Sequence, residues 1–301
     1  YTGVGFSRIS VNPSLSIIYK LNYAWRFTAH ASYKERYGEM TDLYDRPYQT
    51  DYRNSVWNCG ILPVYRQQLY SVYGEYKSTA REFFATVNLT HNREWYNRIY
   101  EQRIENGQVQ RVSLPLSNHG SGYTVKSTLS KGFYDLGLKT SLMALLNISK
   151  AEQISGGQRL PYQYRLMRLE PKVIWTPNRH WETSYQTDIR YGGNKIGERT
   201  RLAPLWNVTQ QVQLSYIFSP IEASLSVDHY HNDVNEDQSV NAVFADFSVL
   251  WKSRRLQLTA TATNLFDKRT YGYTRYASLE SYTSWVRIRP REFLVAIRYQ
   301  L

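Results

Sequence analysis

The segment Leu136-Gly-Leu-Lys-Thr-Ser-Leu-Met-Ala-Leu-Leu-Asn-Ile148 alternates between two kinds of side chain. Its even positions are mostly apolar, and its odd positions include Lys139, Ser141 and Asn147. A period of two is that of a β-strand, in which successive side chains point to opposite faces. The segment therefore predicts a strand with one apolar face and one mostly polar face.

The same alternation recurs along the chain, in residues 181–191, 243–251, 256–263 and 293–301. These segments run for about ten residues, which exceeds the five or six typical of soluble sheets and approaches the length that a tilted strand needs to cross a bilayer. Length and alternation together favour strands that cross a membrane.

The connections between these segments alternate in length. Short ones are expected near residues 22–24, 77–81, 132–135, 177–180, 219–220 and 252–254, and longer polar ones near 36–63, 91–120, 151–161, 192–203, 232–239 and 273–284. Short periplasmic turns and long extracellular loops are typical of outer-membrane barrels. We therefore predict an all-β fold, a transmembrane antiparallel up-and-down β-barrel in a Gram-negative outer membrane, with residues 1–301 as a single domain.

A soluble β-sandwich with aromatic cores is the alternative for these strands. Aromatic residues cluster near the strand ends, as rings at the headgroup level of a membrane do. Charged residues recur on the polar face of successive strands, at Lys139, Asp188, Arg190, Asp228 and Asp246. A wet lumen inside an apolar exterior explains both observations with one geometry.

Composition excludes several other classes. No stretch approaches the roughly 18 uncharged apolar residues of a membrane helix. The net charge of +12 comes from scattered Lys and Arg residues without a run of five, which does not favour nucleic-acid binding. Cys59 is the only cysteine, so it cannot form a disulfide within the chain, and no cofactor is predicted.

The expected strand count is about thirteen, beginning with a strand near residues 6–19. Bacterial single-chain barrels close with an even number of strands. Reading Val11-Asn-Pro-Ser14 as a tight turn gives fourteen. Otherwise the chain is expected to be a piece of a larger barrel. Tyr1-Thr-Gly-Val4 does not resemble an export signal, so we expect either a removed signal or a start within a longer protein.

The C-terminal segments resemble the closing hairpin of TonB-dependent outer-membrane receptors, most of all the Bacteroidota branch. The resemblance lies in Asn264-Leu-Phe-Asp267 on the penultimate strand and in Arg289-Pro-Arg291 before the last strand. Family members usually end in Phe, whereas this chain ends in Leu301. The resemblance implies a barrel of 22 strands, of which this chain supplies about the last thirteen, and an N-terminal plug domain that is not present in the chain.

The same resemblance implies active uptake of a scarce nutrient of the siderophore, glycan or peptide type, without enzymatic catalysis. It implies the TonB complex as a partner through the N-terminal region, and a possible surface lipoprotein partner. A passive channel of about fourteen strands is the alternative function.

Two sequence patterns suggest chemistry. His119-Gly-Ser121 has the spacing of a phospholipase-like barrel enzyme, although a loop turn is the more ordinary interpretation. His229 and His231, with Asp233 nearby, are able to bind a transition metal in principle. Strand parity instead predicts an outward, rim-level pair.

Ligand contacts are expected from aromatic and cationic residues of the long loops. The candidates are Tyr44, Tyr48, Tyr52 and Trp57 in one loop, Trp95, Tyr96, Arg98 and Tyr100 in the next, and Tyr273, Arg275 and Tyr276 in the last. The other interpretation is that these side chains pack on a plug or on one another, or contact outer-membrane lipid and lipopolysaccharide. Basic loops beside a phosphate-rich lipid surface account for part of the positive charge.

Overall fold

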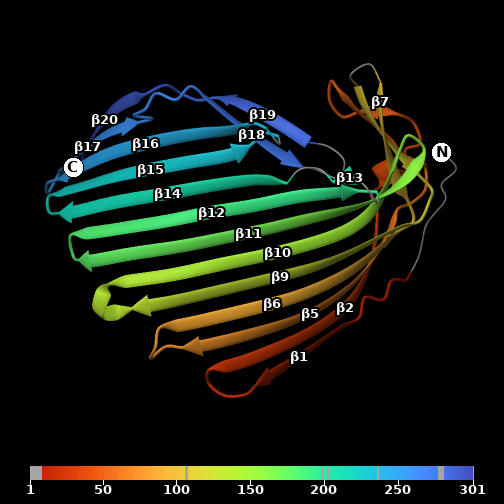
Figure 1. Cartoon of the computed structure of the whole chain (residues 1–301), viewed down its shortest axis with the longest axis horizontal. Helices are drawn as coiled ribbons and strands as arrows, with labels where there is room; N and C mark the ends of the chain where they lie inside the picture. Colours follow the sequence, from red (N-terminus) through yellow and green to blue (C-terminus); the bar gives the residue numbers. More distant parts are fainter. Residues whose placement is uncertain are drawn as a thin grey trace.

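The computed structural model describes residues 9–105, 108–197, 200–201, 204–235, 237–276 and 281–300. In these ranges, thirteen antiparallel strands follow one another in sequence and form one curved wall (Figure 1). They are β1 (Ser14–Lys20), β2 (Trp25–Tyr37), β5 (Val64–Ser78), β6 (Phe83–Tyr96), β9 (Asn118–Phe133), β10 (Leu138–Ser155), β11 (Gln158–Asn178), β12 (Trp181–Ile196), β14 (Leu205–Phe218), β15 (Ile221–Asp233), β16 (Ser239–Lys252), β17 (Leu256–Thr263) and β20 (Glu292–Tyr299). Within the described residues, no helix is long and apolar enough to cross a membrane.

The long connections carry additional short elements at one end of the wall (Figure 1). The 3-10 turn η1 (Met40–Leu43), β3 (Tyr48–Gln49) and β4 (Asn54–Trp57) lie between β2 and β5, and β7 (Ile99–Glu105) and β8 (Gln108–Leu114) lie between β6 and β9. β4 pairs in parallel with β8, so the two connections join into one body, which we call the loop lobe. β13 (Thr200–Arg201) extends β12, and η2 (Tyr134–Leu136) forms the short turn between β9 and β10.

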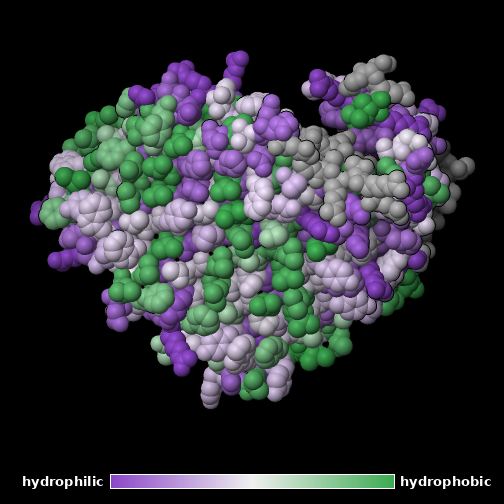
Figure 2. All heavy atoms as spheres, in the orientation of Figure 1, coloured by the Kyte–Doolittle hydropathy of each residue, from purple (hydrophilic) through white to green (hydrophobic). Residues whose placement is uncertain are grey.

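The strand register places apolar side chains on one face of the whole wall. One row crosses seven neighbouring strands through Ile17, Ala29, Val72, Leu89, Val125, Leu146 and Met167. The residues between them face the other way and include Lys126, Asn147, Arg168 and Asp188. Figure 2 shows hydrophobic residues gathered over the middle of the strands and hydrophilic ones toward the rims. The apolar face is therefore the outer one, and the polar face lines the inside.

Two belts of aromatic side chains bound the outer apolar band. The belt near the short turns includes tilted pairs such as Trp25–Tyr76 at 4.8 Å and Trp181–Tyr216 at 4.6 Å between ring centroids. The belt near the long loops includes Tyr191–Trp206 at 4.8 Å. Tyr123 and Phe133 belong to opposite belts on β9. Their spacing, at ~3.3 Å per residue and a tilt of ~40°, gives a band roughly 25 Å tall.

The described residues contain the thirteen predicted strands, and the alternative of a tight turn at Val11-Asn-Pro-Ser14 is wrong. The Tyr33 N–H donates to the Pro13 carbonyl at 3.0 Å, and the Asn12 Oδ1 accepts from the Glu35 N–H at 2.6 Å. The chain therefore continues alongside β2 before β1 begins at Ser14, instead of reversing. Residues 1–8 of the predicted first strand lie outside the described ranges.

The predicted loop at 151–161 is also wrong. β10 and β11 remain paired up to Ser155 and Gln158, and only Gly156 and Gly157 form the turn, at φ +58° and +76°. A two-residue turn with both residues at positive φ favours glycine and lets the strands continue. The hairpin consequently rises beyond the wall toward the loop lobe.

The last hairpin leaves the wall part-way up. β16 pairs with β17 only from Phe247 to Lys252, and β17 ends at Thr263. The chain then forms a separate two-stranded sheet, β18 (Thr270–Tyr276) with β19 (Ser281–Arg287), before β20 returns to the wall. The Tyr271 hydroxyl accepts from the inward-facing Asn232 Nδ2 at 2.8 Å, so this hairpin packs toward the inner face.

Asn264 lies where the chain leaves the wall after β17. Its side chain is buried and its backbone has a φ of +50°. Its Nδ2 donates to the carbonyls of Lys268 and Arg289 at 2.8 and 2.9 Å, its Oδ1 accepts from the Lys268 N–H, and its own N–H donates to the Asp246 Oδ1 at 2.7 Å. The side chain thus ties the outgoing chain to the returning one.

Both edge strands of the wall pair on one side only within the described residues. β1 pairs with β2, and β20 pairs with β17. All residues of β1 and β20 are exposed. Each edge therefore presents a row of unpaired backbone groups.

Candidate functional site

A cavity of about 850 Å³ lies between the inner wall and the loop lobe. We call it the mouth cavity. The wall contributes residues of β6, β9, β10 and β11, including His119, Ser121, Lys150 and Glu152 of outward parity, and the lobe contributes residues of β4, β7 and β8. Its principal lining residues are Asn54, Glu94, Tyr96, Arg98, Tyr100, Glu101, Arg111, Asn118, Gln153 and Tyr162. Carboxylates, guanidinium groups, amides and phenol rings thus converge on one space.

The centre of the lobe side is an aromatic ring between two cations. The Arg111 guanidinium lies 3.7 Å from the Tyr100 ring centroid, and that of Arg98 lies at 5.0 Å. Arg98 is also paired with Asp42 at 2.9 Å, which fixes it against η1. Arg111 makes no ion pair in the described part of the chain, so its charge is available to an anionic or hydroxylated ligand.

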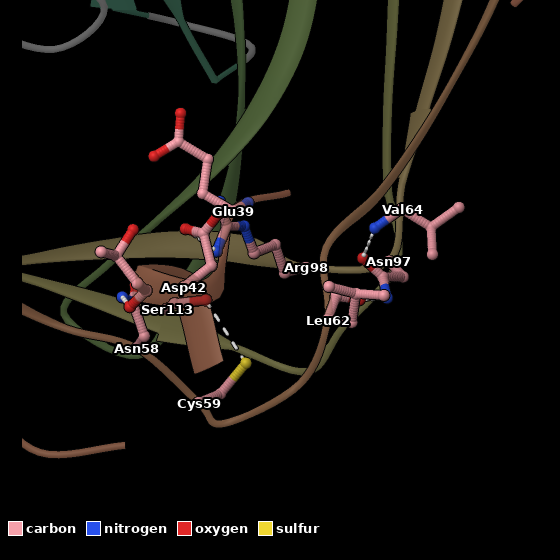
Figure 3. Close-up of polar contacts among 10 residues, drawn as sticks. Glu39, Asp42, Asn58, Cys59, Leu62, Val64, Asn97, Arg98 and Ser113 are labelled. Carbon is pink, nitrogen blue, oxygen red and sulfur yellow. Dashed lines mark hydrogen bonds and ion pairs between the residues drawn. The ribbon is translucent and has the colours of Figure 1, made fainter. Parts of the chain in front are cut away.

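The Arg98 end of the lobe is fixed by a hydrogen-bonded seam, drawn in Figure 3. The Asn97 side chain accepts from the Val64 N–H at 2.8 Å and donates to the Leu62 carbonyl at 2.9 Å. Cys59 is a free thiol, with its Sγ 3.4 Å from the Ser113 Oγ. These contacts link the β2–β5 connection to Asn97, directly after β6, and to β8, so the lobe has a defined position above the wall.

The wall side of the cavity is organised by the Glu94 carboxylate. Its Oε1 accepts from the Tyr65 hydroxyl, the Gln67 amide and the Asn92 amide at 2.9 to 3.1 Å, and its Oε2 accepts from the Tyr96 hydroxyl at 3.1 Å. The four donors fix the carboxylate and both phenol rings. The wall therefore presents a rigid polar and aromatic surface, which suits orientation of a ligand more than proton transfer.

Glu101 connects the lobe to the tip of the β10–β11 hairpin. Its Oε2 accepts from Arg103 at 2.7 and 2.9 Å, and its Oε1 accepts from the Gly157 N–H at 3.0 Å. The hydrogen bond from Arg103, followed by that from the Gly157 backbone, holds the pKa of this carboxyl below its usual value. The carboxylate is buried, so the hairpin tip and the lobe are joined by a charge-assisted contact.

Three of the eleven predicted ligand-contact residues, Tyr96, Arg98 and Tyr100, line the mouth cavity. The first-loop candidates lie elsewhere in the lobe, where Tyr44 packs on Tyr48 with ring centroids 6.1 Å apart and Trp57 donates to the Asp45 carbonyl at 2.9 Å. Tyr52 is 78% exposed and lies outside the cavity lining.

Trp95 and Tyr273 lie away from the cavity lining. Trp95 shares the outward parity of β6, and Tyr273 on β18 packs near Tyr271 at 6.0 Å. The side chains of Arg275 and Tyr276 are outside the described part of the structure.

Sequence reasoning missed several lining residues. Arg111, Asn118 and Tyr162 were not singled out, although strand parity places Asn118 and Tyr162 on the inner face. Glu101 and Arg111 face the cavity only because β7 and β8 form a hairpin, which no periodic pattern in the sequence indicates.

Neither of the two other suggested sites has a catalytic or metal-binding arrangement in the described residues. His119 and Ser121 are two positions apart on β9 with outward parity, both line the mouth cavity, and no hydrogen bond joins them. His229 and His231 face outward on β15, as parity predicts, and His231 is bonded to Asn241 and lies 3.3 Å from Asp233. No group of three or more His, Cys, Asp or Glu residues has metal-binding geometry in the ranges described.

No family model and no curated protein matches this chain. Among solved structures, it is similar to FpvA of P. aeruginosa bound to heterologous pyoverdines, at 10% identity and a TM-score of 0.48, over 95% of this chain and 44% of FpvA. It is similar to the ferric yersiniabactin uptake receptor FyuA from Yersinia pestis at 7% identity and a TM-score of 0.48, over 96% and 50%. The P. putida toluene transporter TodX matches at 12% identity and a TM-score of 0.26, over 97% and 83%. The chain thus spans about half the length of the two receptors.

The wall has the features of an outer-membrane barrel. An apolar band between aromatic belts, a polar inner face, short turns at one rim and long loops at the other occur together in that class. The chain is therefore an outer-membrane β-barrel protein of a Gram-negative bacterium, with the mouth cavity at the extracellular rim.

Proposed function

We propose that this chain forms about the last thirteen strands of a 22-strand TonB-dependent receptor, which takes up a scarce nutrient by ligand-triggered movement of an N-terminal plug. The observation that carries the proposal is a roofed mouth cavity on a wall whose two edge strands each pair on one side only within the described residues. A thirteen-strand barrel closed on itself would pair β1 with β20. An open wall instead accommodates further strands and a wide lumen, and wide barrels are plugged.

The mouth cavity is proposed as the first binding site for the nutrient. A phenol ring between two guanidinium groups and a rigid acidic wall together suit a ligand with anionic or hydroxylated groups and a flat or apolar portion. Siderophores, glycans and peptides all have this mixed character, so the cavity chemistry is compatible with the three substrate types.

The experiment that tests the receptor function separates active uptake from passive flow. The intact protein is expected to show no steady conductance in planar bilayers bathed in KCl, because a plug closes the lumen. In cells, uptake of labelled iron siderophores, glycans or peptides by this protein is expected to stop when a protonophore collapses the proton gradient. Steady conductance together with protonophore-resistant uptake would establish the passive channel instead.

The mouth cavity is tested with the substrate that this screen identifies. Tyr100→Ala removes the ring between Arg98 and Arg111 and is expected to weaken ligand binding about ten-fold. Tyr134→Ala, an exposed residue in the short turn at the other rim, is the matched control and is expected to bind normally. Equal affinities for the two variants would exclude the mouth cavity as the binding site.

A further inference from the structure

A short row of polar side chains interrupts the outer apolar band. The register joins Thr187 on β12, Gln210 on β14 and His229 on β15 as direct cross-strand neighbours of outward parity. On β14, Gln210 lies four residues from Trp206 of the loop-side belt and six from Tyr216 of the belt near the short turns. At ~3.3 Å per residue and a tilt of ~40°, Gln210 is about 10 Å inside the loop-side belt. The row therefore lies at a depth where the bilayer holds no water.

The polar groups of this row have no partners in the part of the chain that the structure describes. Gln210 and His229 are partly exposed and make no side-chain hydrogen bond, and the buried Thr187 hydroxyl makes none either. Four valines lie around the two exposed side chains: Val208 and Val212 on β14, Val227 on β15 and Val243 on β16. The strands themselves therefore offer Gln210 and His229 mostly apolar surroundings.

His231, two residues nearer the loop rim on the same face, shows the opposite arrangement. Its Nδ1 lies 2.9 Å from the Asn241 Oδ1, and its Nε2 lies 3.3 Å from the Asp233 Oδ1. The imidazole at the rim is thus bonded within the chain, whereas the deeper imidazole of His229 is not.

Lipid cannot supply the missing partners of Gln210 and His229. Acyl chains neither donate nor accept hydrogen bonds, and the phosphates of the headgroups lie outside the aromatic belt. An amide or imidazole left unpaired in hydrocarbon is strongly unfavourable. The partner must therefore be another protein surface within the membrane.

The two exposed groups are complementary to a copy of themselves. The Gln210 amide donates through Nε2 and accepts through Oε1, and a neutral imidazole donates through one ring nitrogen and accepts through the other. A surface of one charge sign would repel its copy, but this surface is uncharged when the imidazole is neutral. A two-fold axis along the membrane normal, between β14 and β15, places Gln210 of each copy opposite His229 of the partner subunit, which gives two equivalent contacts.

We propose that the outer face of β14 and β15 binds a second copy of this protein within the membrane, as a two-fold dimer centred on Gln210 and His229. A second copy is held at the same depth by the same two aromatic belts, so its polar pair meets this one at one level. The short side chains of the surrounding valines let the two walls approach closely. The proposal rests on the outer-membrane placement of the wall and is independent of what the barrel transports.

The test measures the proximity of two copies of the intact protein in outer membranes. Cys59→Ser removes the thiol of this chain, and Val227→Cys places a new thiol on the outer face beside the polar pair. A short membrane-permeant bismaleimide is expected to join two chains at this position, giving a product of twice the mass of the protein. Leu89→Cys in the same background lies on the outer face of β6, at an exposed position of the apolar band, and is expected to give no dimer.

The double substitution Gln210→Leu/His229→Leu removes both hydrogen-bonding groups and leaves an apolar surface toward lipid, so the barrel is expected to assemble normally. Cross-linking at Val227→Cys is expected to fall about ten-fold, because both contacts of the dimer are lost. The matched control Gln213→Leu/Ser226→Leu changes a cross-strand pair on the inner face of the same strands and is expected to leave cross-linking unchanged. Unchanged cross-linking in Gln210→Leu/His229→Leu, equal cross-linking at Leu89→Cys, or a product joined to a different protein would overturn the proposal.

Failure here is distinguishable from failure of the receptor function. A protein that transports its substrate against the action of no second copy, with only monomers found by cross-linking at Val227→Cys, contradicts this proposal alone. A protein that forms the cross-linked dimer but conducts ions steadily contradicts the receptor function alone.

Discussion

At the scale of a single residue, Asn264 does more than occupy a turn. Its carboxamide makes three hydrogen bonds to backbone groups of two separate segments, and its backbone adopts the left-handed conformation, which Asn tolerates better than most residues. Asn264→Ala is expected to lower the free energy of unfolding by about 2 to 4 kcal/mol, because buried carbonyls lose their partner and alanine is strained at this φ. Urea denaturation of the protein in detergent measures the change.

Asn264→Gly separates the two causes. Glycine adopts the positive φ without strain but makes no side-chain hydrogen bond. We expect Asn264→Gly to be destabilised less than Asn264→Ala, while both remain below the wild type. Wild-type stability in the glycine variant would show that the hydrogen bonds contribute nothing.

At the scale of the element, the Glu101 contact joins the loop lobe to the β10–β11 hairpin. Because the Arg103 hydrogen bond holds the pKa of Glu101 below its ordinary value of 4.5, the contact contributes stability above that pH and loses it as pH falls through the lowered pKa. We expect the Gly157 amide to exchange faster near pH 3 than at pH 7, after correction for intrinsic exchange rates. Hydrogen exchange followed by mass spectrometry measures the exchange rate at this hairpin tip.

Glu101→Gln is expected to produce the fast exchange already at neutral pH, because a neutral amide no longer forms the ionic bond to Arg103. Asp237→Asn, in the connection between β15 and β16, is the control and is expected to leave exchange at Gly157 unchanged. Slow exchange in Glu101→Gln at pH 7 would mean that the hairpin tip is held by its own turn.

At the scale of the whole molecule, the outer face of the wall contacts lipid and the inner face contacts water. Leu142 lies near mid-height on the outer face of β10, and its neighbour Ser141 faces inward. Leu142→Arg is expected to cost about 2 to 4 kcal/mol, since an arginine at the bilayer midplane is poorly solvated, whereas Ser141→Arg places the same side chain in a wet lumen. The assembled fraction in outer membranes, read from heat-modifiable electrophoretic mobility, is expected to fall only for Leu142→Arg. Similar losses in both variants would contradict the assignment of faces.

The wall was predictable from sequence because lipid and lumen impose a period of two on every strand. The face on which each side chain lies, most turn positions and the number of strands follow from that period, whereas the two-glycine turn at Gly156 and Gly157 does not. The Pro13 segment raised the alternative of fourteen strands because proline suggests a turn, yet at the start of an edge strand its carbonyl still accepts the ladder hydrogen bond from Tyr33.

The mouth cavity was only partly predictable. Trp95 was assigned to a loop, although alternation from Phe83 already places it on the outer face. The lobe depends on the parallel pairing of β4 with β8 and of β7 with β10, between segments far apart in sequence. No local pattern encodes such pairings, so Arg111 and Glu101 were not predicted to meet Tyr100.

The separation of the two aromatic belts has a consequence for the surrounding bilayer. A hydrophobic span of roughly 25 Å is shorter than the ~30 Å hydrocarbon core of an ordinary phospholipid membrane. A bilayer of lipids with long, straight tails must therefore thin around the barrel, whereas a bilayer of shorter lipids matches the distance between the two aromatic belts. We therefore expect the protein to insert preferentially into thinner regions of the membrane, beside proteins with a similarly short hydrophobic span.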